Sequence, residues 1–332
     1  MPWLILAHFK KNSLSKRALV TGCAGFIGSH LTELLLDKGF EVIGVDNFDV
    51  FYDKIIKQKN LSEFITNKNF HFIEADIRNE NTWKNLTEKV DVIFHLAAKA
   101  GVLPSLQQPA EYITTNILGT QLLLDWMKLY EVKKLIFASS SSVYGNQTKI
   151  PFSETDTIDK PISPYASTKK AGELITYTYH HLYQLDVMNL RFFTVFGERQ
   201  RPDLAIRKFI QKILNNEPIE IYGDGSTARD YTYIKDIVGG IFSSYEYIEN
   251  KTNVYEIMNL GNNNPVKLIN LVNTLYEITN RTPNLIYKPM QPGDVNITFA
   301  DISKAKTLLN YEPKTTFKQG LENFLSWHLN QK

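Results

Sequence analysis

The sequence predicts a doubly wound α/β protein, in which helices cover both faces of a parallel sheet, followed by a smaller C-terminal α/β lobe. From Ala18 to about Arg191, short apolar runs alternate with longer segments of helical periodicity. Strands that alternate with helices form parallel sheets through right-handed crossovers. After Phe193 the pattern loosens into shorter elements, separated by Gly, Pro, Asp and Asn clusters that mark turns and long connections.

Six apolar runs are expected to form the sheet. They are ALVTG (18–22), EVIGVD (41–46), FHFIEAD (70–76), VDVIFHLAA (90–98), VKKLIFASS (132–140) and DVMNLRFF (186–193). The chain therefore divides into an N-terminal extension at 1–15, a first domain at 16–193 and a substrate-binding lobe at 194–332, whose segments can cross back to the first domain.

The composition excludes several classes of function. The 37 basic and 35 acidic residues among 332 are mixed along the chain and give a net charge of +2, which provides no basic stripe for nucleic acid. The single cysteine, Cys23, forms no internal disulfide, and no Cys/His cluster indicates a metal. No apolar run approaches the ~20 residues of a membrane span, and the apolar patch from Trp3 to Ala7 is too short for a signal peptide. We expect a soluble, cytoplasmic protein.

The stretch VTGCAGFIGSHL, residues 20–31, places Gly22, Gly25 and Gly28 between the first strand and a helix expected over 26–38. Without Cβ atoms in this turn, a pyrophosphate can approach the backbone N–H groups and the positive end of the helix dipole. Asp46 ends the next strand, where a carboxylate accepts hydrogen bonds from an adenosine ribose. The loop thus predicts a Rossmann-type dinucleotide site, and the acidic residue favours NAD over NADP.

The stretch SPYASTKK places Tyr165 and Lys169 on one face of a helix that Ser163 caps and Pro164 begins. A nearby ammonium favours the phenolate of a tyrosine, whose ordinary pKa of ~10 otherwise makes it a poor base. Residues 139–142 are four serines at the carboxyl end of the fifth strand, where such sheets bind ligands. A hydroxyl there could orient a substrate hydroxyl and share its proton with Tyr165.

The chain resembles the extended short-chain dehydrogenase/reductase family, whose glycine loop reads TGxxGxxG. From about Lys16 to Trp327 it is similar to nucleotide-sugar 4-epimerases, through segments that include HLAAKAGV, TNILGTQLLL, SSSSVYG, SPYASTKKAGE, IYGDGSTARDYTYIKDI and QPGD. By this resemblance the NAD site consists of Gly22, Gly25, Phe26, Ile27, Gly28, Asp46, Asn47, Asp76, Ile77, Ala97, Ala98, Lys99, Asn116, Tyr165, Lys169 and Phe192.

The resemblance also implies the chemistry. Tyr165 and Lys169, with Ser140 or Ser141, would oxidise the sugar at C4, and the 4-keto sugar would rotate and be reduced on its other face, so NAD stays bound. The UDP-sugar contacts would include Ser142, Tyr222 and Arg229, with Asp294 on a ribose. Helices around 109–130 and 164–184 resemble the pair that forms a four-helix homodimer interface in relatives.

The sugar is the open question. FFTVFGERQRPD is similar to the UDP-glucuronate 4-epimerases and supplies Thr194 and Arg201 as carboxylate partners. Leu103 and Glu198 depart from that group, in which Arg and Pro are common, so UDP-glucose/UDP-galactose, or their N-acetyl forms, are alternatives. UDP-glucuronate decarboxylation and a catalytically silent NAD-binding protein also remain open. The serine loop lacks the Asp-Glu pair of 4,6-dehydratases, which disfavours dehydration.

Overall fold

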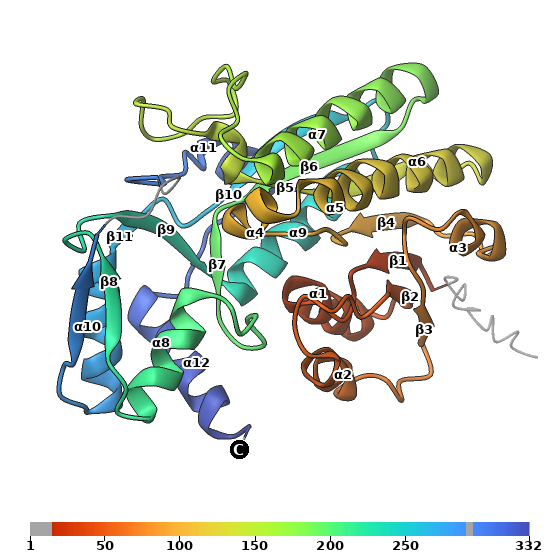
Figure 1. The fold of residues 1–332 in the computed structure, drawn as a ribbon. Coiled ribbons are helices and arrows are strands. Elements are labelled where there is room, and N and C mark those ends of the chain that lie inside the picture. Colours follow the sequence, from red (N-terminus) through yellow and green to blue (C-terminus); the bar gives the residue numbers. More distant parts are fainter. Residues whose placement is uncertain (1–14, 290–294, 332) are drawn as a thin grey trace, which may run out of the picture.

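The structure is a computed structural model that describes residues 15–289 and 295–331. A seven-stranded parallel sheet forms its centre (Figure 1). In order across the sheet, the strands are β10 (Tyr255–Leu260), β6 (Asp186–Phe192), β5 (Lys134–Ser140), β4 (Val92–His95), β1 (Arg17–Thr21), β2 (Glu41–Asp46) and β3 (Phe70–Glu74). The predicted α/β fold class is confirmed, and all six predicted strands are present.

Helices cover both faces of this sheet. One face carries α1 (Phe26–Asp37), α9 (Ile234–Glu249) and α11 (Ser303–Leu309), and the other carries α3 (Glu80–Asn85), α6 (Gly119–Leu129) and α7 (Pro164–Tyr183). Successive strand side chains point to opposite faces. In β4, Val92 and Phe94 accordingly join the core under α1 and α9, whereas Ile93 joins the core on the other face.

The seventh strand comes from the C-terminal part of the chain. β10 pairs in parallel with β6, with Tyr255 opposite Val187, and α9 packs against α1, β5 and β6. Residues 234–260 therefore complete the large sheet, although they lie beyond the expected boundary at 193. The division into domains remains a prediction.

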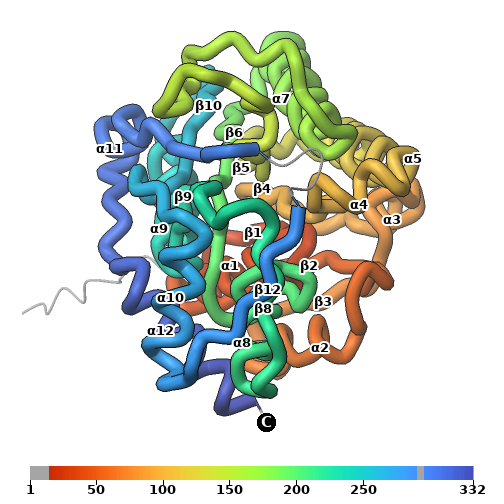
Figure 2. Tube along the Cα trace, turned by 60° about the vertical axis from the view of Figure 1, so that its left-hand side comes forward, coloured from red at the N-terminus to blue at the C-terminus, as the bar shows by residue number. Residues whose placement is uncertain are grey.

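The remaining C-terminal elements form the smaller lobe. Its sheets are β11–β9–β7 (Pro265–Lys267, Ala228–Tyr233, Thr194–Phe196) and β12–β8 (Leu285–Lys288, Ile219–Tyr222). Figures 1 and 2 show α8 (Ala205–Leu214), α10 (Leu268–Thr279) and α12 (Phe317–Leu329) gathered beside β8. In the described residues, no helix combines the length and the apolar character that crossing a membrane requires.

The helix expected around 109–130 is interrupted. The structure has α5 (Pro109–Ile113), a π-helical turn η1 (Thr114–Leu118) and then α6, while α2 (Lys54–Ser62), α4 (Val102–Gln107) and the 3₁₀ turn η2 (Ser141–Tyr144) are short. A π turn inserts an extra residue and is frequent at functional sites. Here it carries Asn116, whose side chain is buried.

Candidate active site

The glycine loop brings two backbone segments into close contact at the start of α1. A Cβ added to Gly28 would lie 2.0 Å from the carbonyl oxygen of Gly22, so only glycine fits there. Helix α1 begins at Phe26 with no acidic residue in its first turn, which leaves its N–H groups and positive dipole end available to an anion. This cradle fits the pyrophosphate of a dinucleotide.

A cavity of about 380 Å³ lies beside this loop, at the carboxyl ends of the central strands. The predicted cofactor residues other than Asn116 line it, together with Ser140, Thr194 and Arg201. Asn116 lies behind the wall, where its amide accepts from Lys99 N–H at 2.8 Å and donates to Lys99 C=O at 3.0 Å. The structure therefore brings the predicted cofactor residues and the predicted catalytic residues Ser140, Tyr165 and Lys169 together in one cavity.

The acidic end of β2 braces the glycine loop. Asp46 accepts hydrogen bonds from Ala24 N–H at 3.1 Å and Phe48 N–H at 2.8 Å. Its burial raises the pKa of the carboxyl, an effect that the nearby Lys57 opposes. Asn47 donates to Asp76 at 3.0 Å, which joins the ends of β2 and β3 at the predicted adenosine side.

A chain of hydrogen bonds between buried polar side chains lies behind the cavity, and the sequence analysis did not predict it. His95 Nδ1 lies 2.7 Å from Thr21 Oγ1, and His95 Nε2 lies 3.0 Å from Thr120 Oγ1. Because Thr120 donates to Asn116 C=O at 2.7 Å, it accepts from His95, so Nε2 carries the proton and Nδ1 accepts from Thr21. Burial lowers the pKa of His95 to about 3, and the imidazole is neutral. The polar residue inside the apolar run VDVIFHLAA was the available signal.

Tyr165 and Lys169 project into the cavity from the first turns of α7. Ser163 caps this helix by accepting from Ala166 N–H at 3.1 Å, which confirms the predicted start at Pro164. Burial raises the pKa of Tyr165, and a hydrogen bond with Ser140 opposes that rise. Lys169 is buried and donates to Ala138 C=O at 2.7 Å, and burial lowers its pKa to about 7. Tyr165, Ser140 and Lys169 thus line the same cavity.

An ion pair inside the protein supports this group. Arg191 donates from Nε and Nη2 to the two carboxylate oxygens of Glu173 at 2.8 and 2.9 Å, with both side chains almost fully buried. Glu173 lies one helical turn after Lys169 and accepts from Ser139 at 2.7 Å. The pair therefore fixes α7 against β6 and the end of β5, from which Ser140 projects.

The second predicted pair, Thr194 and Arg201, also lines this cavity. The Arg201 guanidinium stands 4.9 Å from the centre of the Phe51 ring and donates to Ala100 C=O at 3.3 Å. It also forms an ion pair with Asp203, at 2.8 Å. One cavity is therefore lined both by the Tyr165 phenol and by the Arg201 guanidinium.

Comparison with known proteins identifies the family. The model of the family described as GDP-mannose 4,6 dehydratase matches residues 19–324. A UDP-glucuronate 4-epimerase of Thermodesulfobacterium geofontis is 45% identical over 312 residues, which is 93% of this chain and 95% of that protein. The chain belongs to the extended short-chain dehydrogenase/reductase family.

Solved structures agree with this assignment. The UDP-glucuronic acid 4-epimerase of Bacillus cereus, in complex with UDP-glucuronic acid and NAD, is 37% identical with a TM-score of 0.89 and covers 95% of this chain and 100% of its own. The UDP-glucose 4-epimerase of Thermotoga maritima is 34% identical with a TM-score of 0.86 and covers 95% and 99%. Within the family, the protein is an NAD-dependent nucleotide-sugar epimerase.

The predicted catalytic alternative Ser141 and the predicted substrate residues Ser142, Tyr222 and Arg229 do not line this cavity. Ser141 and Ser142 belong to η2, where Ser142 N–H donates to Ser140 at 3.2 Å. Tyr222 ends β8, and Arg229 in β9 donates to the C=O of Ala228 at 2.9 Å. Asp294 lies outside the described residues. The roles of these side chains in UDP-sugar binding remain predictions.

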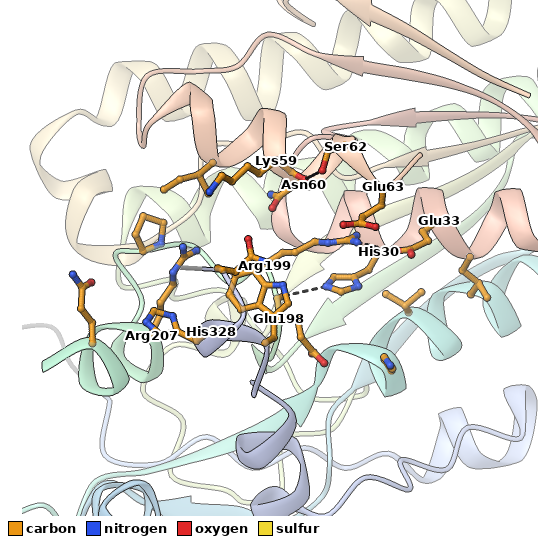
Figure 3. A pocket seen from close by; sticks show the side chains of 18 of the residues that line it. His30, Glu33, Lys59, Asn60, Ser62, Glu63, Glu198, Arg199, Arg207 and His328 are labelled. Atoms are coloured by element: carbon orange, nitrogen blue, oxygen red, sulfur yellow. Dashed lines mark hydrogen bonds and ion pairs between the residues drawn. The ribbon is translucent and has the colours of Figure 1, made fainter. Parts of the chain in front are cut away.

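A larger cavity, of about 1130 Å³, is lined by residues of α1, α2, α8, α9 and α12 and by Glu198, Arg199 and Pro202 (Figure 3). His30 bonds to Glu198 C=O at 3.0 Å, and Arg199 pairs with Glu33 at 2.9 Å. Its wall carries equal numbers of acidic and basic residues, namely Glu33, Asp37, Glu63 and Glu198 against Lys59, Arg199, Arg207 and Lys235. This balance favours no class of ligand, so we assign the chemistry to the smaller cavity, which contains Tyr165 and Lys169.

Proposed function

We propose that the protein interconverts UDP-glucuronate and UDP-galacturonate. The observation that carries this proposal is the Arg201 guanidinium, which lines the same cavity as Tyr165 and Thr194. A guanidinium fork matches a carboxylate bidentately, so it would distinguish a uronic acid from a neutral hexose. The similarity to the UDP-glucuronate 4-epimerases supports the same substrate.

Each of these residues would have its own role in the reaction. Tyr165 accepts the proton of the sugar 4-hydroxyl, and the Ser140 hydroxyl, which lines the same cavity, orients that hydroxyl. The ammonium form of Lys169 favours the phenolate. The glycine loop and the end of β2 would hold NAD, which when bound would supply the acceptor and donor for the C4 hydride. Thr194 and Arg201 hold the carboxylate meanwhile, which discourages loss of CO₂ from the 4-keto sugar.

The direct test is incubation of the purified protein, without added NAD, with UDP-glucuronate and separately with UDP-glucose. Products are resolved by NMR. UDP-galacturonate without UDP-pentose is the expected product and shows retained cofactor together with epimerisation. Turnover of UDP-glucose alone contradicts the proposed substrate and favours the UDP-galactose alternative, whereas UDP-pentose indicates the decarboxylase.

Arg201→Ala is expected to lower kcat/KM for UDP-glucuronate by about 10- to 100-fold, because a charge-assisted hydrogen bond is worth about 1.5–3 kcal/mol. The value for UDP-glucose should change much less. Arg281→Ala, which removes an exposed arginine in the C-terminal lobe, is the matched control. Equal losses for the two sugars would contradict a carboxylate role for Arg201.

We also propose a homodimer through α6 and α7, because these helices resemble the pair that forms a four-helix dimer interface in relatives. These helices expose large apolar side chains, namely Leu129 (76%), Leu174 (57%), Tyr177 (52%) and Leu182 (57%). Such a surface is expected to be covered by a partner. Light scattering should give twice the monomer mass, and Leu174→Arg should shift the protein towards the monomer. A wild-type monomer at micromolar concentration would rule the dimer out.

A further inference from the structure

The carboxylate-binding edge of Arg201 already holds a carboxylate. Its Nε donates to Asp203 Oδ1 at 3.0 Å, and its Nη2 donates to Asp203 Oδ2 at 2.8 Å. This two-donor edge of a guanidinium binds a planar carboxylate bidentately. A sugar carboxylate that uses the same edge must therefore take the place of Asp203.

The other contacts of Arg201 are independent of Asp203. Nη1 donates to Ala100 C=O, and the guanidinium face stands over Phe51. The Arg201 side chain is 16% exposed, whereas the Asp203 side chain is 34% exposed and lies outside the cavity wall. Arg201 thus stays at the cavity whichever carboxylate it binds, and Asp203 has access to solvent.

The backbone around Asp203 would allow this exchange. Leu204 N–H donates to Arg201 C=O at 3.2 Å, and Pro202 restricts the chain between the two charged residues, so the turn persists without the ion pair. Asp203 also immediately precedes Leu204, the N-cap of α8, whose first turn contains no acidic residue. A carboxylate near a helix N-terminus interacts favourably with the helix dipole. This interaction would still stabilise the Asp203 carboxylate when Arg201 binds another anion.

We propose that Asp203 is a specificity-determining residue that competes with the sugar carboxylate for Arg201. A neutral sugar leaves the Arg201–Asp203 pair intact, whereas a uronic acid that binds bidentately through Nε and Nη2 must displace Asp203. The competition lowers the preference of the site for UDP-glucuronate over UDP-glucose. This inference rests on the proposed function, because it requires Arg201 to face the sugar carboxylate.

The test compares Asp203→Asn with the wild type. The amide keeps the shape of the carboxylate and one acceptor oxygen but loses the charge. The ratio of kcat/KM for UDP-glucuronate to that for UDP-glucose should rise roughly fivefold, as for the loss of a competing ion pair, and the change should appear in KM rather than in kcat. Glu312→Gln, an exposed residue in the C-terminal part, removes the same charge and should leave the ratio as it is.

A ratio that stays constant or falls in Asp203→Asn would overturn the proposal, since Asp203 would then only orient Arg201. A second measurement separates this failure from failure of the proposed function. If the wild type turns over only UDP-glucose, the dissociation constants of both nucleotide sugars are measured in a Tyr165→Phe background, with and without Asp203→Asn. Tighter binding of UDP-glucuronate alone supports the competition, and unchanged binding rejects it.

Discussion

Tyr165→Phe should lower kcat for 4-epimerisation by about 10³-fold, because removal of a positioned acid–base group typically costs 10²–10⁴. The phenol lines the cavity together with Ser140, and it lies on the same helix face as the buried Lys169. Phenylalanine keeps the ring and its edge-to-face contact with Tyr112, at 6.2 Å between centroids. The fold and the bound NAD should therefore persist, as circular dichroism and the cofactor absorbance would show.

The sequence contains a matched control for this variant. Tyr247 and Lys251 have the same four-residue spacing, and Lys251 lies over the Tyr247 ring on α9, away from the cavity. Tyr247→Phe is expected to retain wild-type turnover. If Tyr165→Phe kept normal turnover while holding NAD, another residue would have to accept the proton, and the assignment of the catalytic group would be wrong.

The order of strands and helices could be predicted because it depends on local pattern. Each of the six strands is a compact apolar run, and Ser163 with Pro164 marks the start of α7 by capping chemistry alone. β10 was missed as a strand of the large sheet, because its pairing with β6 joins residues 68 apart in register, such as Tyr255 and Val187. The apolar pattern of the sequence locates a strand, but pairing with a strand far away in the sequence decides which sheet the strand joins.

The site follows the same division. Tyr165, Lys169 and the glycine loop are signalled by spacing on one helix or in one turn, and the structure places them in one cavity. Asn116 belongs to the predicted cofactor set, but its hydrogen bonds to Lys99 depend on the π turn, which the sequence pattern did not indicate. The Arg201–Asp203 pair depends on side-chain orientation within a turn. Such contacts become visible only when the backbone is known.

The Glu173–Arg191 ion pair yields the largest expected effect on stability. Glu173→Gln should lower the free energy of unfolding by about 3–5 kcal/mol, because it leaves the Arg191 charge buried without a counter-charge. Neither side chain is more than 2% exposed, so water does not replace the lost carboxylate. Urea unfolding followed by circular dichroism measures the difference. Glu246→Gln, an exposed glutamate on α9, is the control and should change stability by less than about 0.5 kcal/mol.

The pH dependence of this variant gives an independent check. Burial raises the pKa of Glu173, but hydrogen bonds and charge from Arg191 outweigh that effect and hold it below its usual range. A carboxylate whose pKa is lowered on folding stabilises the protein above its unfolded pKa, and this contribution is lost as the pH falls through the folded pKa. The stability gap between wild type and Glu173→Gln should therefore narrow in acid.

A double variant separates the cost of an unpaired charge from the value of the pair. Replacing both partners, as Glu173→Leu with Arg191→Met, removes both buried charges, and such apolar replacements are often neutral or stabilising. We expect stability above that of Glu173→Gln but lower activity than wild type, because Ser139 loses its acceptor beside Ser140, which we propose acts in catalysis. If the double variant were as unstable as Glu173→Gln, packing and the hydrogen bonds to Ser139 and Tyr144 would be the main contribution, rather than charge compensation.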